Sequence, residues 1–177
     1  MTKRCPLATD ADAPLVGPKA AFPAWAEDDG RAAGYSWHVY LLPFIEERIL
    51  FDEIKEGSQG LKLAAFDPSL SIETTHPSQI QIASLRCPSY SGETIATAIE
   101  YAGGIGDVAV GNYVALPATH IRADGTLEEN GVLVSKWSRA NEGGKGIKLR
   151  ELGDGMSGTL LACESREQAY ASWYDGQ

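Results

Sequence analysis

The chain has 177 residues, of which 44% are hydrophobic and 22% charged, with a formal net charge of −9 and an isoelectric point near 4.8. This composition is typical of a single globular domain and excludes a largely disordered chain. The negative charge disfavours nucleic acid as a partner, because binding to phosphates requires clustered Lys and Arg side chains. Since no apolar run approaches the roughly 20 residues that span a bilayer, we expect the sequence as given to be soluble.

Residues 1–34 are rich in proline and glycine and follow neither a helical nor a strand period. We therefore predict a loop-rich lead-in over this range, followed by one head domain over residues 35–177. The opening MTKRC carries two basic residues without an apolar segment behind them, so it is not a complete secretion signal.

The stretch SWHVYLLPFIEERILFDEI carries aliphatic side chains at helical spacing, which predicts one broad buried helix face. We assign this face to Leu41, Leu42, Ile45, Ile49 and Leu50. Pro43 fits the first turn of a helix, where its missing N–H costs nothing, so we predict a helix over residues 43–55 after an irregular YSWHVY segment. A kink in a longer helix is the alternative. Arg48 and Asp52 have the spacing of an ion pair, and Gly57 is a natural end of the helix.

The rest of the chain has mainly strand-like segments. IQIASLRC, residues 80–87, alternates as a strand does, and residues 93–102 have the pattern of a short helix or an insertion. Four further segments, NYVALPATHI, VLVSKW, KGIKLREL and GTLLACES, are separated by turns rich in Gly, Asn and Asp. This order predicts a loop-rich α+β fold, in which the N-terminal helix packs on an antiparallel β-sheet.

Two loops have weak ligand signals. GGIGDVA has G-x-G-x-x-A spacing, but a dinucleotide site requires a strand before the glycines and a helix after them, and here the order is reversed. HIRADGTLEENG contains His120, Asp124, Glu128 and Glu129, for which a loose calcium site is the alternative to a solvated hairpin tip. We predict neither a metal nor a cofactor.

Nucleophilic catalysis is not indicated. Ser89 and Ser91 do not form a G-x-S-x-G elbow, because the first glycine is absent. A serine or cysteine nucleophile would need His38, His76 or His120 as its base. We predict no catalytic residue, and a hydrolase of unrecognised type is the alternative.

Three cysteines permit one disulfide and one spare thiol, and their spacing leaves the pairing open. Cys5 and Cys87 each precede a proline in an irregular segment and form the candidate bridge. Cys163 lies in an apolar segment, where we expect a buried thiol.

Four tryptophans, Trp25, Trp37, Trp137 and Trp173, offer a second hypothesis of function. They could stack on carbohydrate or peptide as exposed aromatic contacts, with Trp37, Trp137 and Trp173 as the leading candidates. We expect Trp173 and Tyr174 to be uncovered, because they stand near the last residue of the sequence.

Six segments carry a family resemblance. In order they are SWHVYLLPFIEERILFDEI, LRCPSY, GNYVALPATH, DGTLEENGVLV, LRELGDGMSGTLLACES and REQAYASWYDG, and they cover about residues 35 to 176. Together they resemble the bacterial prepilin-like family with domain of unknown function 1559, which is abundant in planctomycete-type bacteria. No single segment is decisive, but six in one order make chance similarity improbable.

This resemblance implies a type IV pilin-like or type II secretion pseudopilin-like protein, with an apolar N-terminal anchor helix followed by a globular α+β head. We therefore expect a non-enzymatic structural protein whose partners are other pilin-like subunits or secretion-apparatus proteins. Membrane contact is expected only through an anchor helix, which the sequence as given lacks, so we expect an excised head-domain fragment or a truncated gene product. The implied location is the periplasm or cell surface, where a disulfide at Cys87 is favoured. Trp37 and Tyr40 are expected to cover the seam that the anchor helix would use.

Overall fold

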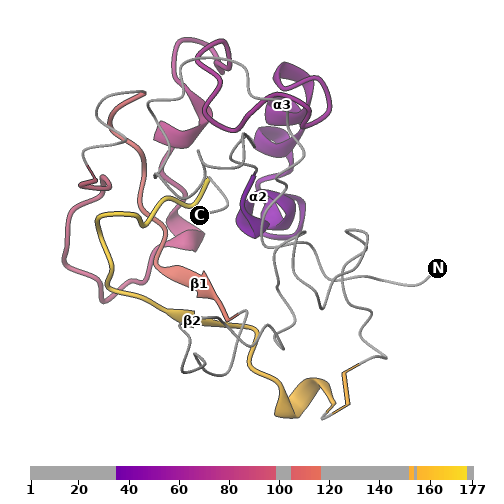
Figure 1. The fold of residues 1–177 in the computed structure, drawn as a ribbon, viewed down its shortest axis with the longest axis vertical. Coiled ribbons are helices and arrows are strands. Elements are labelled where there is room, and N and C mark those ends of the chain that lie inside the picture. The colour runs from indigo at the N-terminus through magenta and orange to yellow at the C-terminus, as the bar shows by residue number, and fades with distance from the viewer. Residues whose placement is uncertain (1–34, 99–104, 117–151, 154, 175–177) are drawn as a thin grey trace, which may run out of the picture.

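The computed structural model describes residues 35–98, 105–116, 152–153 and 155–174, so the lead-in over residues 1–34 lies outside the described part. The described chain combines short helices with a small two-stranded antiparallel sheet, joined by long irregular segments (Figure 1). This is the expected loop-rich α+β class. The helices and strands, in chain order, are α2 (Trp37–Leu41), η2 (Leu42–Phe44), α3 (Arg48–Gly57), η3 (Pro77–Gln79), η4 (Ala83–Leu85), β1 (Tyr113–Ala115), η7 (Met156–Gly158) and β2 (Ala162–Glu164), where η denotes a 3₁₀ helix.

The predicted single helix over residues 43–55 is divided: its first residues belong to the 3₁₀ turn η2, and the α-helix α3 begins only at Arg48. The YSWHVY segment, predicted to be extended or irregular, contains all of α2 except its last residue, and the Ser36 hydroxyl caps that helix by accepting from the backbone N–H of His38. Pro43 stands in the first turn of η2, as its missing N–H allows. Glu46 then has a positive φ of 69°, which interrupts the helical path before α3 begins. Gly57 is the last residue of α3, as predicted.

The interruption at Glu46 changes which side chains face the core. Leu42 and Leu50 are buried, and Leu41 and Ile45 are half-buried. Ile49 is 77% exposed, so its assignment to the buried face is wrong. The predicted stripe assumed one continuous helical period, whereas the positive φ rotates α3 relative to the preceding turn. Ile54, at 1% exposure, is the other residue that anchors α3 in the core.

The segment between α3 and β1 is less regular than the sequence predicted. Residues 80–87 form no strand, since η4 occupies Ala83–Leu85. Residues 93–98 are extended rather than helical, and Ile95 forms an antiparallel bridge with Ala109. The cause is tertiary hydrogen bonding: the backbone N–H of Ala96 donates to Val108 O at 2.8 Å, which an α-helix here would not permit.

The sheet consists of β1 and β2, which pair antiparallel with Tyr113 opposite Glu164 and Ala115 opposite Ala162. These strands lie within the predicted strand segments NYVALPATHI and GTLLACES, so both predictions are confirmed in part. The predicted strands VLVSKW and most of KGIKLREL lie outside the described residues. Figure 1 shows the two strands on the side of the molecule away from α3.

The last described segment, residues 165–174, is named here the C-terminal arm, and it enters the core. Its Trp173 and Tyr174 are fully buried, so the expectation that they are uncovered is wrong. The backbone N–H of Ser36 donates to Tyr174 O at 3.0 Å, and the indole N–H of Trp173 donates to Ile80 O at 2.8 Å. These bonds connect the arm to the start of α2 and to the irregular segment between α3 and β1, which we call the middle segment.

Gly111 lets the arm approach the neighbouring backbone. A Cβ atom at Gly111 would lie 2.9 Å from the Cβ of Trp173, closer than side chains tolerate. The N–H of Gly111 donates to Ala171 O at 2.7 Å across this contact. The glycine is therefore required by close packing of two chain segments.

Candidate functional site

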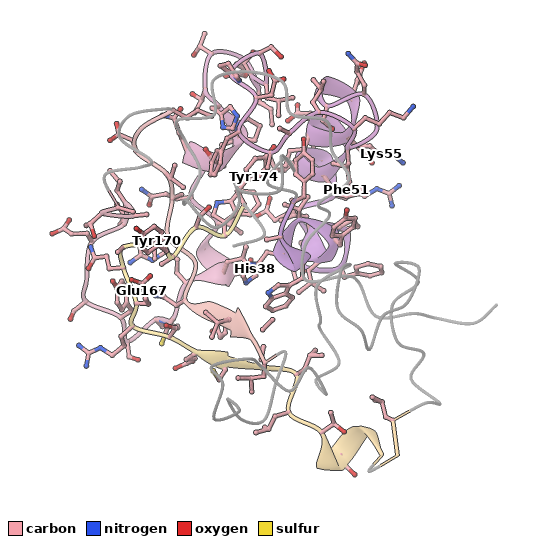
Figure 2. All side chains as sticks on the ribbon, in the orientation of Figure 1. His38, Phe51, Lys55, Glu167, Tyr170 and Tyr174 are labelled. Carbon is pink, nitrogen blue, oxygen red and sulfur yellow. The ribbon has the colours of Figure 1, made fainter. Side chains whose placement is uncertain are left out.

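The buried aromatic cluster lies where the C-terminal arm meets the helices and the middle segment. Tyr174 is at its centre, with ring centroids 5.5 Å from Tyr35, 5.7 Å from His76 and 5.3 Å from Trp173, all at steep angles. Edge-to-face contacts of this kind stabilise a core beyond the area that they bury. Burial is also the main reason that the pKa of Tyr174 is raised well above its ordinary value. Figure 2 shows Tyr174 inside the molecule, between the helices and the other described segments.

His38 and Ser36 are neighbours in this core but do not form a nucleophile and its base. The Ser36 hydroxyl donates its single proton to Trp173 O and accepts from the backbone N–H of His38. The contact of 3.3 Å between Ser36 Oγ and His38 Nδ1 therefore requires the proton on Nδ1, which makes the imidazole the donor. Burial lowers the pKa of His38 to about 4, so the ring is neutral at physiological pH.

His76 has a structural role in capping η3. Its Nδ1 accepts from the backbone N–H of Ser78 at 3.2 Å, and the Gln79 side chain accepts from the His76 backbone N–H at 3.2 Å, which completes a capping box. Burial lowers the pKa of His76 to about 4, against an opposing effect of Asp67. Asp67 in turn accepts from the backbone N–H and the hydroxyl of Ser69 at 2.9 and 2.6 Å.

The predicted aromatic contacts are placed differently from the prediction. Trp173 is fully buried and Trp37 is 8% exposed, with its ring stacked on His38 at 4.1 Å, so neither presents a free face for stacking. Both assignments are wrong, because Trp173 packs in the core and donates to Ile80 O, and one face of Trp37 is covered by His38. Trp25 and Trp137 lie outside the described residues, as does His120.

The cysteines differ in exposure. Cys87 has a free thiol that donates to Glu164 Oε2 at 3.4 Å and lies 3.1 Å from Ser89 Oγ. Cys5 lies outside the described residues, so its pairing with Cys87 stays a prediction. Cys163 is exposed rather than buried, and Glu164, the next residue of β2, is exposed as well.

An open cleft of about 550 Å³ lies on the surface formed by η4 and the loop after it. Its lining residues are Gln81, Ile82, Ala83, Arg86, Cys87, Pro88, Tyr90 and Thr94. The Arg86 guanidinium lies over the Tyr90 ring, with Cζ 5.4 Å from the ring centroid. The sequence predicted a disulfide partner at Cys87 and excluded a nucleophile elbow at the serines of this CPSYSGE stretch, but it did not predict the cleft. The available signal was Cys87–Pro88, because proline at the second position of a turn brings the flanking side chains together.

The backbone on either side of Arg86 is fixed by hydrogen bonds to the buried residue Asn112. Asn112 is fully buried, and its side-chain oxygen accepts from the backbone N–H of Cys87 at 3.1 Å. Its own backbone N–H donates to Leu85 O at 2.9 Å, and its side-chain N–H donates to Ser165 O at 3.3 Å. Arg86 therefore stands between two residues whose backbones are both hydrogen-bonded to Asn112, Cys87 through the side chain and Leu85 through the backbone.

Two further properties of the described part of the chain bear on function. Within it, no three side chains of His, Cys, Asp or Glu are arranged as metal ligands. None of the helices found there has the length and apolar character needed to cross a membrane.

Comparison with known proteins identifies one family. Residues 18–175 match the family model described as "Protein of unknown function (DUF1559)". No curated protein and no solved structure matches the chain.

Proposed function

The chain belongs to the DUF1559 family, and on this premise we propose that it is a non-enzymatic interaction module. More specifically, it is the globular head of a prepilin-like, pseudopilin-like component of a secretion system or surface filament, and it works outside the cytoplasm. Its partners are other pilin-like subunits. The resemblance of the six segments supports this role, and the distribution of apolar side chains over the helices supports an interaction surface.

The observation that carries the proposal is the exposure of two large apolar side chains, one on η2 and one on α3. Phe44 is 81% exposed and Ile49 is 77% exposed, although both are large hydrophobic side chains. We call these two residues, together with the half-buried Leu41 and Ile45, the helical apolar patch. Covering such side chains with a partner is favourable by roughly 25 cal/mol for each Å² removed from water.

The titratable groups of the core support a structural rather than a chemical role. His38 and His76 are buried and neutral, and each uses its Nδ1 in a local hydrogen bond that shapes the backbone. The Ser36 hydroxyl is likewise committed to a backbone carbonyl. Side chains that hold the fold in this way are not free to exchange protons with a substrate.

Site-specific photo-crosslinking tests the proposal. A photoreactive phenylalanine analogue replaces Phe44 in one protein and Lys55 in another, in cells that produce the full set of pilin-like subunits. Lys55 is the matched control, because it is exposed on α3 and lies six residues after Ile49, which places it about 120° around the helix from that residue. We expect crosslinks to a pilin-like subunit from position 44 and none from position 55.

The double variant Phe44→Ser, Ile49→Ser provides the complementary result. Because both side chains are exposed, its melting temperature should stay near that of the parent protein, whereas the crosslinked partner in the first experiment should no longer co-purify. Equal crosslinking at positions 44 and 55, or crosslinking only to proteins that are not pilin-like, would contradict the proposal.

A further inference from the structure

We propose that the cleft beside η4 binds an acidic peptide segment of a partner protein, with one carboxylate placed on the Arg86 guanidinium. This inference concerns a different surface from the helical apolar patch and does not depend on it. The peptide contributes one carboxylate and an adjacent apolar side chain. The cleft volume of about 550 Å³ is within the range of sites that bind small ligands.

Arg86 has unused hydrogen-bonding capacity. Its Nη1 atom is buried and has no hydrogen-bond acceptor, and the side chain forms no ion pair with any described residue. A guanidinium withdrawn from water without an acceptor is unfavourable. The Arg86 side chain also lines the cleft, where a carboxylate suits it best because two oxygens match the planar fork of N–H groups.

Tyr90 holds the guanidinium in place and is itself fixed at several points. Its hydroxyl donates to Gln168 Oε1 at 3.1 Å, and its backbone N–H donates to Cys87 O at 3.0 Å. The ring packs so closely on Gly92 that a Cβ atom there would lie 2.3 Å from its Cζ and Oη atoms. Tyr90 is therefore enclosed between Gly92 and Arg86, which pre-organises the site before any ligand arrives.

The chemistry of the lining indicates a peptide in preference to a glycan or a polyanion. Arg86 covers one face of the Tyr90 ring and Gly92 lies against the ring, so a sugar cannot stack freely there as it does on exposed aromatics. One arginine in a chain of net charge −9 does not attract a polyanion. Ile82, Ala83 and Pro88 give the cleft an apolar part, which suits an aliphatic side chain beside the carboxylate.

A pair of matched peptides tests the inference. The probe is the blocked pentapeptide Ala-Leu-Glu-Ile-Ala, and its partner replaces Glu with Gln. We expect the Glu peptide to bind about tenfold more tightly in titration calorimetry, because hydrogen bonds to a charged carboxylate are the stronger ones. Binding should also slow alkylation of Cys87, which lines the cleft, without slowing that of Cys163, which does not.

Three variants assign the effect to the cleft. Arg86→Gln should remove the preference for the Glu peptide, and Gly92→Ala should weaken binding because the added Cβ displaces the Tyr90 ring. Arg48→Gln is the control for net charge, since Arg48 is exposed and lies on α3; it should leave the preference unchanged. Melting curves confirm that each variant folds.

Several results would overturn the inference. Equal binding of the two peptides would show that the cleft does not recognise a carboxylate. A preference for the Glu peptide that persists in a folded Arg86→Gln variant would show that Arg86 does not bind the carboxylate. Tighter binding of an oligogalacturonate than of the Glu peptide would replace the peptide with an acidic glycan as occupant. Loss of binding in the double variant Phe44→Ser, Ile49→Ser would place the ligand on the helical apolar patch, so this test fails separately from that of the proposed function.

Discussion

Helix α3 and the C-terminal arm contribute to the same core by different means. α3 is a regular amphipathic helix, and it buries Leu50 and Ile54 while most of its other side chains remain in solvent. The arm has no helix and only an isolated bridge at Ser172, yet Trp173 and Tyr174 are among the most deeply buried residues of the molecule. Figure 1 shows the arm returning from β2 toward the helices. In this protein, burial therefore follows long-range contacts rather than regular secondary structure.

The largest effect is expected for Trp173→Ala, which tests how much the C-terminal arm contributes to the stability of the core. Removing the indole leaves a cavity at the centre of the aromatic cluster and removes the donor to Ile80 O, so we expect a loss of about 3–5 kcal/mol in the free energy of unfolding. Urea denaturation measures it. Trp173→Phe is the control, because it keeps a ring and removes the N–H. A loss below about 1 kcal/mol for Trp173→Ala would show that the arm does not hold the core together.

On the helix side, Ile54→Ala and Ile49→Ala form a matched pair with the same chemical change. Ile54 is 1% exposed, so its truncation should cost about 2–5 kcal/mol, toward the lower end because α3 has a free outer side. Ile49 is 77% exposed, and its truncation should change the free energy of unfolding by no more than about 0.5 kcal/mol. Equal losses in the free energy of unfolding for the two variants would contradict the arrangement in which α3 buries Ile54 and exposes Ile49.

The pH dependence of stability at the junction between the two regions is expected to be smaller than the effect of Trp173→Ala or Ile54→Ala. The pKa values of His38 and His76 are lowered by burial to about 4, below their ordinary value of 6.5. The unfolded chain therefore binds more protons, so the stability that depends on their neutral form is complete above about pH 6.5 and is lost as the pH falls toward 4. Each histidine should cost about 1 kcal/mol between about pH 7.5 and about pH 5.5.

Thermal melts at several pH values measure this dependence. His76→Asn, which keeps an acceptor for the cap of η3, should remove about half of it, because one of the two buried imidazoles is lost. A variant with the same pH dependence as the parent would show that other groups are responsible.

Local signals in the sequence predicted some features well. The turn position of Pro43, the helix end at Gly57 and the exposed pair of Arg48 and Asp52 at 3.0 Å are all as expected. These three features depend on the backbone geometry of one residue or on the spacing of side chains within a single helical turn. Residues that are neighbours in the sequence determine both. The positive φ of Glu46 has no such signal, because glutamate gives no local preference for it.

The candidate site was less accessible to prediction. Arg86 and Tyr90 are four residues apart, but their contact depends on the turn at Cys87–Pro88 and on the space that Gly92 leaves. The amide of Asn112 then fixes the backbone of Cys87 from a different part of the chain. Hydrogen bonds between segments that are distant in the chain leave no periodic pattern in the sequence, so residue spacing could not predict them.

The sequence by itself determined the family, the mixed α+β class and the amphipathic character of α3, because these depend on segment order and local spacing. Only the tertiary structure decided that Trp173 and Tyr174 are buried, that Ile49 is exposed and that residues 80–87 form no strand. The physical reason is that irregular backbone must satisfy its hydrogen bonds through distant partners, and those partners select which side chains leave water.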